Sequence, residues 1–332
     1  MKTFALFGAG RIGRIHAGNI AAHPGARLKY VVDVDAAAAA AVAGTAGAAV
    51  AETRDVLADP GVDALLVASP TDTHADLIEA GAAAGKSILC EKPIDLGVAR
   101  ARAAVEAARR ANILLAIGFN RRYDPSFRRI RAGIDAGEIG AVETVLIVSR
   151  DPSPPPVAYV RRSGGLFRDM TIHDLDMARW LLGEEPVEIT AHGSCLVDPA
   201  IGAAGDIDTA AVTLRTASGR IAQIANTRRA VFGYDQRIEV CGSTGMLAAG
   251  NRKSTSVERA TAAGYATDPA LPFFLERYAD AYRLELDAFV RCLRGEAADI
   301  ASGADGVRAL EIAEACDRSR EARATVVLES RP

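Results

Sequence analysis

Residues 3–14 have the sequence TFALFGAGRIGR, in which a short apolar run leads into three glycines. Gly8, Gly10 and Gly13 have G-x-G-x-x-G spacing, and residues 15–22 have a helical pattern. The first glycine permits a tight turn from strand to helix, the second lets the backbone approach a pyrophosphate, and the third lets the helix pack closely on the strand. The helix N-terminus then presents free N–H groups to phosphate. The sequence therefore predicts a dinucleotide-binding turn.

An acidic residue follows at the spacing that this turn requires. The next apolar run, residues 28–32, ends at Asp33, which lies 20 positions after Gly13. A carboxylate at this point bonds the ribose hydroxyls and repels a 2′-phosphate. We therefore predict NAD rather than NADP as the cofactor. The alternative is an ordinary β-turn-α unit with a surface aspartate.

The composition is that of a globular protein with no dominant charge. The 332 residues are 49% hydrophobic and 24% charged, and the formal net charge is −3. This balance argues against a general nucleic-acid or membrane-surface binder. The five cysteines form no C-x-x-C pair, which favours a reducing cytoplasm and gives neither a zinc nor a disulfide framework. We expect no signal peptide and no membrane span.

Strand-like and helix-like segments alternate over the first part of the chain. Apolar runs at 63–68, 87–90 and 113–117 are separated by helical patterns at 75–84 and 96–111. This alternation predicts an α/β fold in which residues 1–120 form a Rossmann domain with a doubly wound parallel sheet. Ligands of such sheets bind beyond the carboxyl ends of the strands.

The pattern changes after residue 120. Strand-like runs at 187–192, 209–216, 221–227 and 236–241 are divided by short turns, and helical patterns return at 273–293 and 304–323. Consecutive strands with short links predict an antiparallel sheet. We therefore expect residues 121–332 to form a C-terminal α+β domain with an open, largely antiparallel sheet.

Lys92 stands at the end of a predicted strand, between Glu91 and Pro93, beside the expected nicotinamide position. A cationic lysine there could hold a substrate oxygen and stabilise a developing alkoxide. The alternative is a surface salt bridge with Glu91. Another strand ends in the loop Ser69–His74, which offers hydroxyls and an imidazole. His74 could bond a cofactor or cap the following helix.

Asp169 and His173 are four residues apart, which places them on one helix face. Histidine is the usual general base near neutral pH, and an acidic neighbour can orient it. The alternative is a helix-capping aspartate and a hydrogen-bonded core histidine. A metal site that also uses Asp174 is disfavoured because Asp174 points about 100° away from His173 on the helix. We predict no metal.

Four stretches together resemble the glucose–fructose oxidoreductase/inositol dehydrogenase (Gfo/Idh/MocA) family. They are GAGRIG at 8–13, CEKP at 90–93, GFNRRYD at 118–124 and GGLFRDMTIHD at 164–174. The third of these stretches, together with the proline-rich segment 149–159, looks most like the inositol 2-dehydrogenase branch. One departure is Met170, where some members have threonine.

The resemblance implies a tetrameric NAD-dependent dehydrogenase that acts on a CH–OH group, in which the domain of residues 121–332 serves substrate binding and oligomerisation. The catalytic residues would be Lys92, Asp169 and His173. His173 would take the hydroxyl proton, Asp169 would support it, and Lys92 would polarise the oxygen. The residues expected to bind the cofactor are Gly8, Gly10, Arg11, Ile12, Gly13, Asp33, Ser69, Thr71, His74, Glu91 and Lys92. Those expected to line the substrate pocket are Arg122, Asp151, Asp176, Tyr234 and Tyr282.

The leading functional hypothesis is oxidation of myo-inositol to 2-keto-myo-inositol (scyllo-inosose). A second hypothesis keeps the site and changes the substrate to scyllo-inositol, to a pyranose sugar such as glucose or levoglucosan, or to a glycoside cleaved by transient oxidation. A third is a non-catalytic NAD-binding sensor, which has no need of Lys92 and His173. The expected partners are the small-molecule substrate and further copies of the same chain. No other partner is expected.

Overall fold

The computed structural model describes residues 1–328, which fall into two compact units. The first unit comprises Met1–Tyr123 and Ala281–Leu310, and the second comprises Asp124–Asp280 and the chain from Glu311 onward. The division expected at residue 120 lies close to the end of the first segment. It did not anticipate that the chain returns to the first unit at Ala281. That return adds a helix to the nucleotide-binding fold.

The first unit alternates strands and helices along most of its length. Its elements are β1 (Lys2–Phe7), α1 (Arg11–Ala22), β2 (Ala26–Val32), α2 (Ala36–Ala46), β3 (Ala49–Val50), α3 (Thr53–Ala58), β4 (Ala64–Val67), η1 (Thr71–Thr73), α4 (His74–Ala83), β5 (Ser87–Glu91), α5 (Val98–Arg110), β6 (Leu115–Gly118), η2 (Asn120–Tyr123) and α11 (Ala279–Leu293). This order agrees with the predicted α/β pattern.

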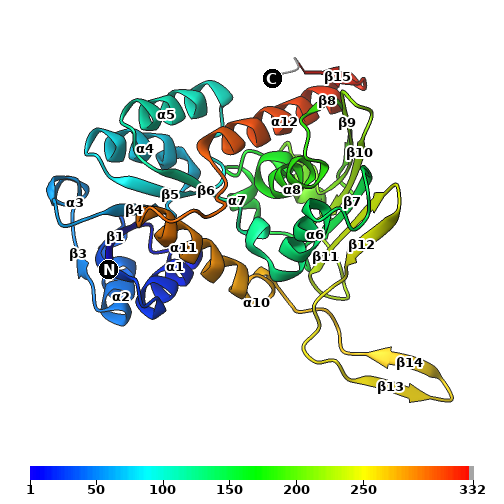
Figure 1. Ribbon diagram of the computed structural model, residues 1–332, viewed down its shortest axis with the longest axis horizontal. Coiled ribbons are helices and arrows are strands. Elements are labelled where there is room, and N and C mark those ends of the chain that lie inside the picture. The colour runs from blue at the N-terminus through cyan, green and yellow to red at the C-terminus, as the bar shows by residue number, and fades with distance from the viewer. Residues whose placement is uncertain (329–332) are drawn as a thin grey trace. The chain divides into compact units, whose positions relative to one another are not determined.

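The sheet of the first unit has the strand order β3-β2-β1-β4-β5-β6, and all its pairings are parallel. This is the doubly wound order of a dinucleotide-binding fold, so the prediction is confirmed. Helices α4 and α5 lie on one side of the sheet, and α1, α2 and α11 lie on the other (Figure 1). Phe4 and Leu6 of β1 share a buried core with Ile20 of α1 and Phe289 of α11. Their apolar contacts hold the glycine-rich turn in place.

The second unit consists of a seven-stranded sheet, helices and a separate hairpin. Its elements are α6 (Pro125–Asp135), β7 (Val142–Arg150), α7 (Val157–Val160), η3 (Phe167–Thr171), α8 (Ile172–Leu182), β8 (Pro186–Ser194), α9 (Pro199–Ala203), β9 (Thr209–Thr216), β10 (Ile221–Thr227), β11 (Asp235–Gly242), β12 (Gly245–Ala249), β13 (Glu258–Thr261), β14 (Gly264–Thr267), α10 (Phe274–Arg277), α12 (Gly303–Ala322) and β15 (Val326–Val327). Helix α12 begins in the first unit and ends in the second.

The large sheet of the second unit has the order β12-β11-β7-β10-β9-β8-β15. The β7–β10 pair is parallel, and the other pairs are antiparallel. The expected largely antiparallel sheet is therefore confirmed. Strand β9 alternates buried and exposed residues along its length. Because the period of a strand is two, this alternation leaves one face of the sheet open.

Several local features differ from the predictions. The helix expected over 273–293 is interrupted at Tyr278, which separates α10 from α11. The segment of Asp169 begins as a π-helical turn, η3, before the α-helix. The β13–β14 hairpin was not anticipated, because its residues are all exposed and its sequence lacks an apolar face. It projects from the rest of its unit (Figure 1).

Candidate functional site

The three glycines of the first turn have the geometry that their spacing predicts. Gly8 has a φ of +100°, which favours glycine, and a Cβ there would lie 2.4 Å from the Ala68 carbonyl oxygen. A Cβ on Gly13 would lie 1.9 Å from the Gly8 carbonyl oxygen. By contrast, a Cβ on Gly10 would meet nothing within 4 Å. The first and third positions therefore require glycine because a side chain would clash with the backbone. At the second position, the space beside the backbone is open to a pyrophosphate.

Asp33 lies at the end of β2 and contacts this turn directly. Its Oδ2 accepts a hydrogen bond from the Ala9 N–H at 2.5 Å, and its Oδ1 accepts one from the Asp35 N–H at 2.8 Å. Gly10, the N-cap residue of α1, has no side chain to cap the helix. The N–H groups of the first helical turn remain available for phosphate. Glycines, helix terminus and carboxylate together fit NAD.

Lys92 follows β5 in a turn that His74 supports. The His74 Nδ1 lies 2.8 Å from the Pro93 carbonyl oxygen, and its Nε2 lies 2.8 Å from the Ser69 carbonyl oxygen. The imidazole is 1% exposed. It therefore connects the loop after β4 to the Lys92–Pro93 turn. In the same loop the Ser69 and Thr73 hydroxyls are hydrogen-bonded at 2.6 Å. Cofactor contacts of Ser69, Thr71 and His74 remain predictions.

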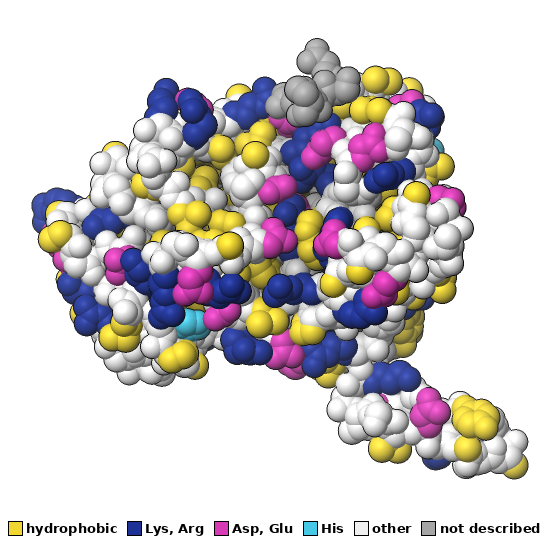
Figure 2. Space-filling model, in the orientation of Figure 1, with side chains coloured by type: hydrophobic (Ala, Val, Ile, Leu, Met, Phe, Trp, Pro, Cys, Tyr) yellow, Lys and Arg dark blue, Asp and Glu magenta, His cyan; other side chains and the backbone are white. Residues whose placement is uncertain are grey.

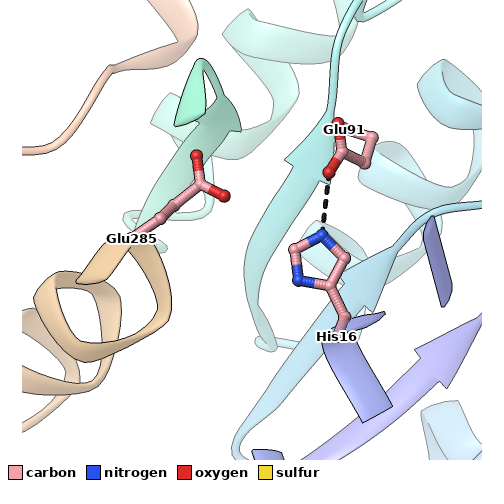
Figure 3. A group of neighbouring side chains, drawn as sticks. All are labelled: His16, Glu91 and Glu285. Carbon is pink, nitrogen blue, oxygen red and sulfur yellow. Dashed lines mark hydrogen bonds and ion pairs between the residues drawn. The ribbon is translucent and has the colours of Figure 1, made fainter. Parts of the chain in front are cut away.

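Glu91, which precedes Lys92, points toward His16 of α1 and Glu285 of α11 (Figure 3). The His16 Nε2 lies 2.8 Å from Glu91 Oε1. The two carboxylates and the imidazole have ligand atoms within 4.8 Å of one another, so these residue types could hold a metal ion. Glu285 is 1% exposed, and burial, together with the Glu91 charge, raises its pKa well above the usual value. Protonation of Glu285 would remove one negative charge from the set without a cation.

Two residues expected at the substrate lie in the first unit. The Arg122 guanidinium forms an ion pair with Asp305, with 3.0 Å between Nη2 and Oδ1. Burial raises the pKa of Asp305, but the Arg122 charge and hydrogen bonds from Ser302 outweigh this effect and lower it to about 2. The Tyr282 ring stands edge-on to the His16 ring, with centroids 5.5 Å apart.

Asp169 lies in the η3 turn and contacts two residues of its own unit. Its Oδ1 accepts a hydrogen bond from the Tyr159 hydroxyl at 2.7 Å, and its Oδ2 accepts one from Arg228 Nη2 at 3.0 Å. Tyr159 is 46% exposed. Burial and the Asp169 charge raise the pKa of Tyr159. The hydroxyl therefore stays protonated and can donate the hydrogen bond to Asp169.

The segment of His173 is fixed by buried polar contacts to β10. The Thr171 hydroxyl donates to Asn226 Oδ1 at 2.7 Å, and the Asn226 amide donates to Asp174 Oδ2 at 2.8 Å. Asp174 is fully buried, so its contact with Asn226 is structural. His173 is partly exposed. Contacts of Thr171 and Asp174 thus anchor the helical segment on both sides of His173.

The other predicted substrate residues also lie in the second unit. Asp151 follows β7, and its Oδ2 lies 3.9 Å from Arg228 Nη1. Asp176 is fully buried and pairs with Arg179, with 3.6 Å between Oδ1 and Nη1. The Tyr234 ring stands edge-on to the Tyr278 ring. Arg228 therefore brings two predicted site residues, Asp151 and Asp169, to one guanidinium.

Sequence reasoning missed Arg228, Tyr159 and Glu285. Arg228 lies 59 positions from Asp169, and no short motif links the two. Tyr159 follows the proline-rich segment, which drew attention to the loop without identifying the side chain. Glu285 lies in an amphipathic helix, where the sequence pattern is equally compatible with a glutamate on the exposed face. The available signal was a single carboxylate on the buried face of an amphipathic helix.

The surface charge is consistent with a small-molecule ligand. On the face shown in Figure 2, basic and acidic side chains are interspersed rather than gathered into one patch. Within residues 1–328, no helix combines the length and the apolar character needed to cross a membrane. All five cysteines are free thiols.

Comparison with known proteins gives matches over most of the chain. Residues 2–119 match an oxidoreductase family with an NAD-binding Rossmann fold, and residues 127–248 match the GFO/IDH/MocA C-terminal domain. An inositol 2-dehydrogenase of Rhizobium meliloti is 52% identical, over 95% of this chain and 96% of the relative.

Solved structures give the same picture. The crystal structure of a myo-inositol dehydrogenase from Corynebacterium glutamicum is 44% identical, with a TM-score of 0.95 and full coverage of both chains. A scyllo-inositol dehydrogenase from Lactobacillus casei, solved with NAD(H) and scyllo-inositol, is 30% identical with a TM-score of 0.90. That match covers 98% of this chain and 99% of the other.

Proposed function

We propose that this chain, which belongs to the GFO/IDH/MocA family of NAD-binding oxidoreductases, oxidises myo-inositol to 2-keto-myo-inositol. The observation that carries the proposal is the presence of Lys92, Asp169 and His173 in a chain whose first turn has the geometry of an NAD site. The inositol 2-dehydrogenase that is 52% identical to this chain supports the choice of substrate.

The reaction removes a hydride and a proton from one CH–OH group. The glycine-rich turn and Asp33 would hold NAD, which would supply the acceptor for the hydride. His173 takes the hydroxyl proton, since a neutral imidazole is a suitable base near neutral pH. Asp169 stabilises the imidazolium that results. Lys92 donates to the same oxygen and stabilises negative charge as it develops there. The C–H and O–H bonds break, and the carbon–oxygen double bond forms.

The predicted substrate residues have the chemistry that a polyol requires. Arg122 offers donors, whereas Asp151 and Asp176 offer acceptors, and Tyr234 and Tyr282 present both an apolar ring and a hydroxyl. A ring that carries a hydroxyl on every carbon needs several such groups at once. Scyllo-inositol is the second candidate, because the Lactobacillus casei relative was solved with that compound. The two substrates differ in the orientation of one hydroxyl.

We also propose that the enzyme is a cytoplasmic homotetramer that assembles through the open face of its second sheet. Leu146, Ile221 and Met246 are at least 36% exposed, and they lie on β7, β10 and β12. The strand register places Ile221 beside Thr144, Thr144 beside Cys241, and Cys241 beside Met246, so these residues share one face. The five free thiols favour a reducing compartment.

A polyol panel tests the proposed function. NADH formation would be followed with NAD and, separately, myo-inositol, scyllo-inositol, chiro-inositol, glucose and levoglucosan, with NADP in parallel. Saturable turnover that is fastest with myo-inositol supports the proposal. Preference for a sugar would keep the chemistry and reject the substrate. NAD binding without turnover of any compound would favour a sensor, or a glycoside hydrolase that regenerates its cofactor.

A further inference from the structure

Arg228 is a buried cation that contacts the predicted catalytic carboxylate. It follows β10, and its backbone N–H donates to the Asp208 carbonyl oxygen at 2.9 Å. Its Nη2 donates to Asp169 Oδ2 at 3.0 Å, and its Nη1 lies 3.9 Å from Asp151 Oδ2. The side chain is 2% exposed. A guanidinium removed from water to this extent requires carboxylate partners, and Asp169 and Asp151 supply them.

The second oxygen of Asp169 is held from a different segment. Tyr159, in α7, donates its hydroxyl to Asp169 Oδ1 at 2.7 Å. Donors on both oxygens fix the plane of the carboxylate as well as its position. A carboxylate held in this way is an orienting group rather than a mobile acid. Charge-assisted bonds of this type are also stronger than neutral ones.

Arg228 acts from the same strand end that anchors the His173 helix. Asn226 lies two residues earlier, near the end of β10, and Arg228 directly follows the strand. Asn226 contacts Thr171 and Asp174, whereas Arg228 contacts Asp169. These two side chains therefore hold the segment that carries both predicted catalytic residues.

We propose that Arg228 is a positioning residue of the dehydrogenase, which, together with Tyr159, fixes Asp169 so that this carboxylate can support His173. The inference rests on the proposed function, because it concerns how the proposed catalytic set is held. Arg228 also connects Asp169 to Asp151, so the carboxylate expected to contact the polyol and the carboxylate expected to support the base share one cation. Arg228 itself does not contact the reacting atoms.

The charged and titratable groups near Asp169 define the expected pH behaviour. They are Tyr159 from α7, Asp151 after β7, Arg228 after β10, and Arg168 and His173 on the same helical segment. Arg168 is paired with Asp317, whereas Arg228 is bonded to Asp169. An adjacent cation favours the ionised form of a carboxylate and the neutral form of an imidazole. Loss of Arg228 should therefore move the acid limb of the kcat profile to higher pH.

Arg228→Gln and Arg228→Lys test this role by steady-state kinetics against pH. We expect Arg228→Gln to lower kcat at pH 7 by roughly tenfold, with the acid limb shifted upward by about one unit or more. Arg228→Lys keeps the charge and should restore the position of the acid limb and part of kcat. The matched control is Arg229→Gln, which removes a neighbouring exposed arginine and should leave kcat and the limb unchanged.

Tyr159→Phe removes one donor from Asp169 without changing the net charge. It should lower kcat by about threefold and shift the acid limb less than Arg228→Gln does. NADH affinity, measured by fluorescence, should stay unchanged in all these variants, because the nucleotide-binding unit is not altered. A fall in kcat that Arg228→Lys does not rescue, with an unshifted acid limb, would overturn the positioning role and leave Arg228 a structural residue.

A double-mutant cycle keeps the test independent of turnover. Urea unfolding of the Arg228→Gln, Asp169→Asn and doubly substituted proteins gives the coupling between the two side chains. A clear favourable coupling energy supports the contact between Arg228 and Asp169, whether or not a polyol is oxidised. If no polyol is oxidised, the proposed function is rejected but the contact still stands. Additive effects would show that Arg228 does not hold Asp169, and would overturn the inference.

Discussion

The Asp33 carboxylate is hydrogen-bonded to the backbone of the glycine-rich turn, with 2.5 Å between its Oδ2 and the Ala9 nitrogen. Asp33 therefore ties the end of β2 to the turn after β1, and we predict that it also presents negative charge to the ribose of the cofactor. A phosphate on that ribose would be repelled by the same carboxylate.

Asp33→Ala should weaken the preference for NAD. We expect kcat/KM with NAD to fall by about tenfold or more, because a charge-assisted hydrogen bond is lost, and kcat/KM with NADP to rise relative to it. The measurement is the ratio of the two kcat/KM values. Asp35→Ala, which removes the cap of α2 in the same loop, is the control and should leave the ratio unchanged. An unchanged ratio in Asp33→Ala would contradict the assignment.

Lys92→Met should remove most of the turnover. A cation that stabilises a developing alkoxide contributes about a hundredfold or more to kcat, and Met keeps the length of the side chain without its charge. Lys253→Met changes a surface lysine of the second unit and provides the control. Retention of more than a few per cent of wild-type kcat, with normal NADH affinity, would remove Lys92 from the catalytic set.

Asp305→Asn should destabilise the protein at neutral pH. The pKa of Asp305 is lowered from 3.8 to about 2, so the ionised carboxylate stabilises the folded state above pH 3.8, and this contribution disappears as the pH falls through 2. The shift corresponds to about 2 kcal/mol of unfolding free energy at pH 7. Because Asp305 holds Arg122, the KM for the polyol should also rise.

Urea unfolding at several pH values checks the stability effect of Asp305→Asn. The difference in unfolding free energy between Asp305→Asn and the wild type should decrease steadily below pH 4. Asp55→Asn breaks an exposed ion pair with Arg54 and should cost less than about 0.5 kcal/mol at any pH. A destabilisation of Asp305→Asn that does not vary with pH would point to lost packing instead of a lost charge.

Glu285→Gln should make the protein at least as stable as the wild type at pH 8. A buried carboxyl with a raised pKa favours the protonated form in the folded state, so the wild type loses stability as the pH rises above 4.5. Gln keeps the shape of the protonated acid, so the variant should not lose stability in this way. The stability of Glu285→Gln relative to the wild type should therefore decrease toward pH 5. Thermal unfolding across this pH range provides the measurement.

Two further results bear on the same cluster. Asp280→Asn, on the same helix, breaks an ion pair with Arg252 and should show no such pH trend between pH 5 and pH 8. Added Zn²⁺ or Mn²⁺ should raise the unfolding temperature of the wild type no more than it raises the unfolding temperature of Glu285→Gln. Stoichiometric metal binding that Glu285→Gln abolishes would reassign His16, Glu91 and Glu285 as a metal centre.

Leu146→Glu should disrupt the proposed tetramer. A charge in the middle of an apolar contact between sheets is costly to bury, so the assembly should dissociate. Light scattering after size-exclusion chromatography measures the mass directly. Leu196→Glu introduces the same charge on an exposed leucine outside the sheet and should leave the mass unchanged. Equal masses for the two variants would exclude the open face as the interface.

The sequence predicted those parts of the fold whose signals are local. The glycine spacing and Asp33 lie within 26 residues of one another, and strands β9 and β10 have the predicted bounds because each alternates apolar and polar side chains. The contacts of Asp169 with Arg228, and of His16 with Glu91, join positions 59 and 75 residues apart. No periodicity encodes such contacts. They follow from strand order and from the way helices pack on the sheets.

Transfer of deuterium to the cofactor tests the central claim most directly. The wild-type enzyme would be given NAD and myo-inositol that carries deuterium in place of the hydrogen on C2, and the products would be analysed by mass spectrometry. We expect one deuterium in the reduced cofactor and an unlabelled 2-keto product. Turnover that leaves the label on the polyol would place the oxidation at another carbon. No reduced cofactor at all, despite NAD binding, would contradict the proposed dehydrogenase.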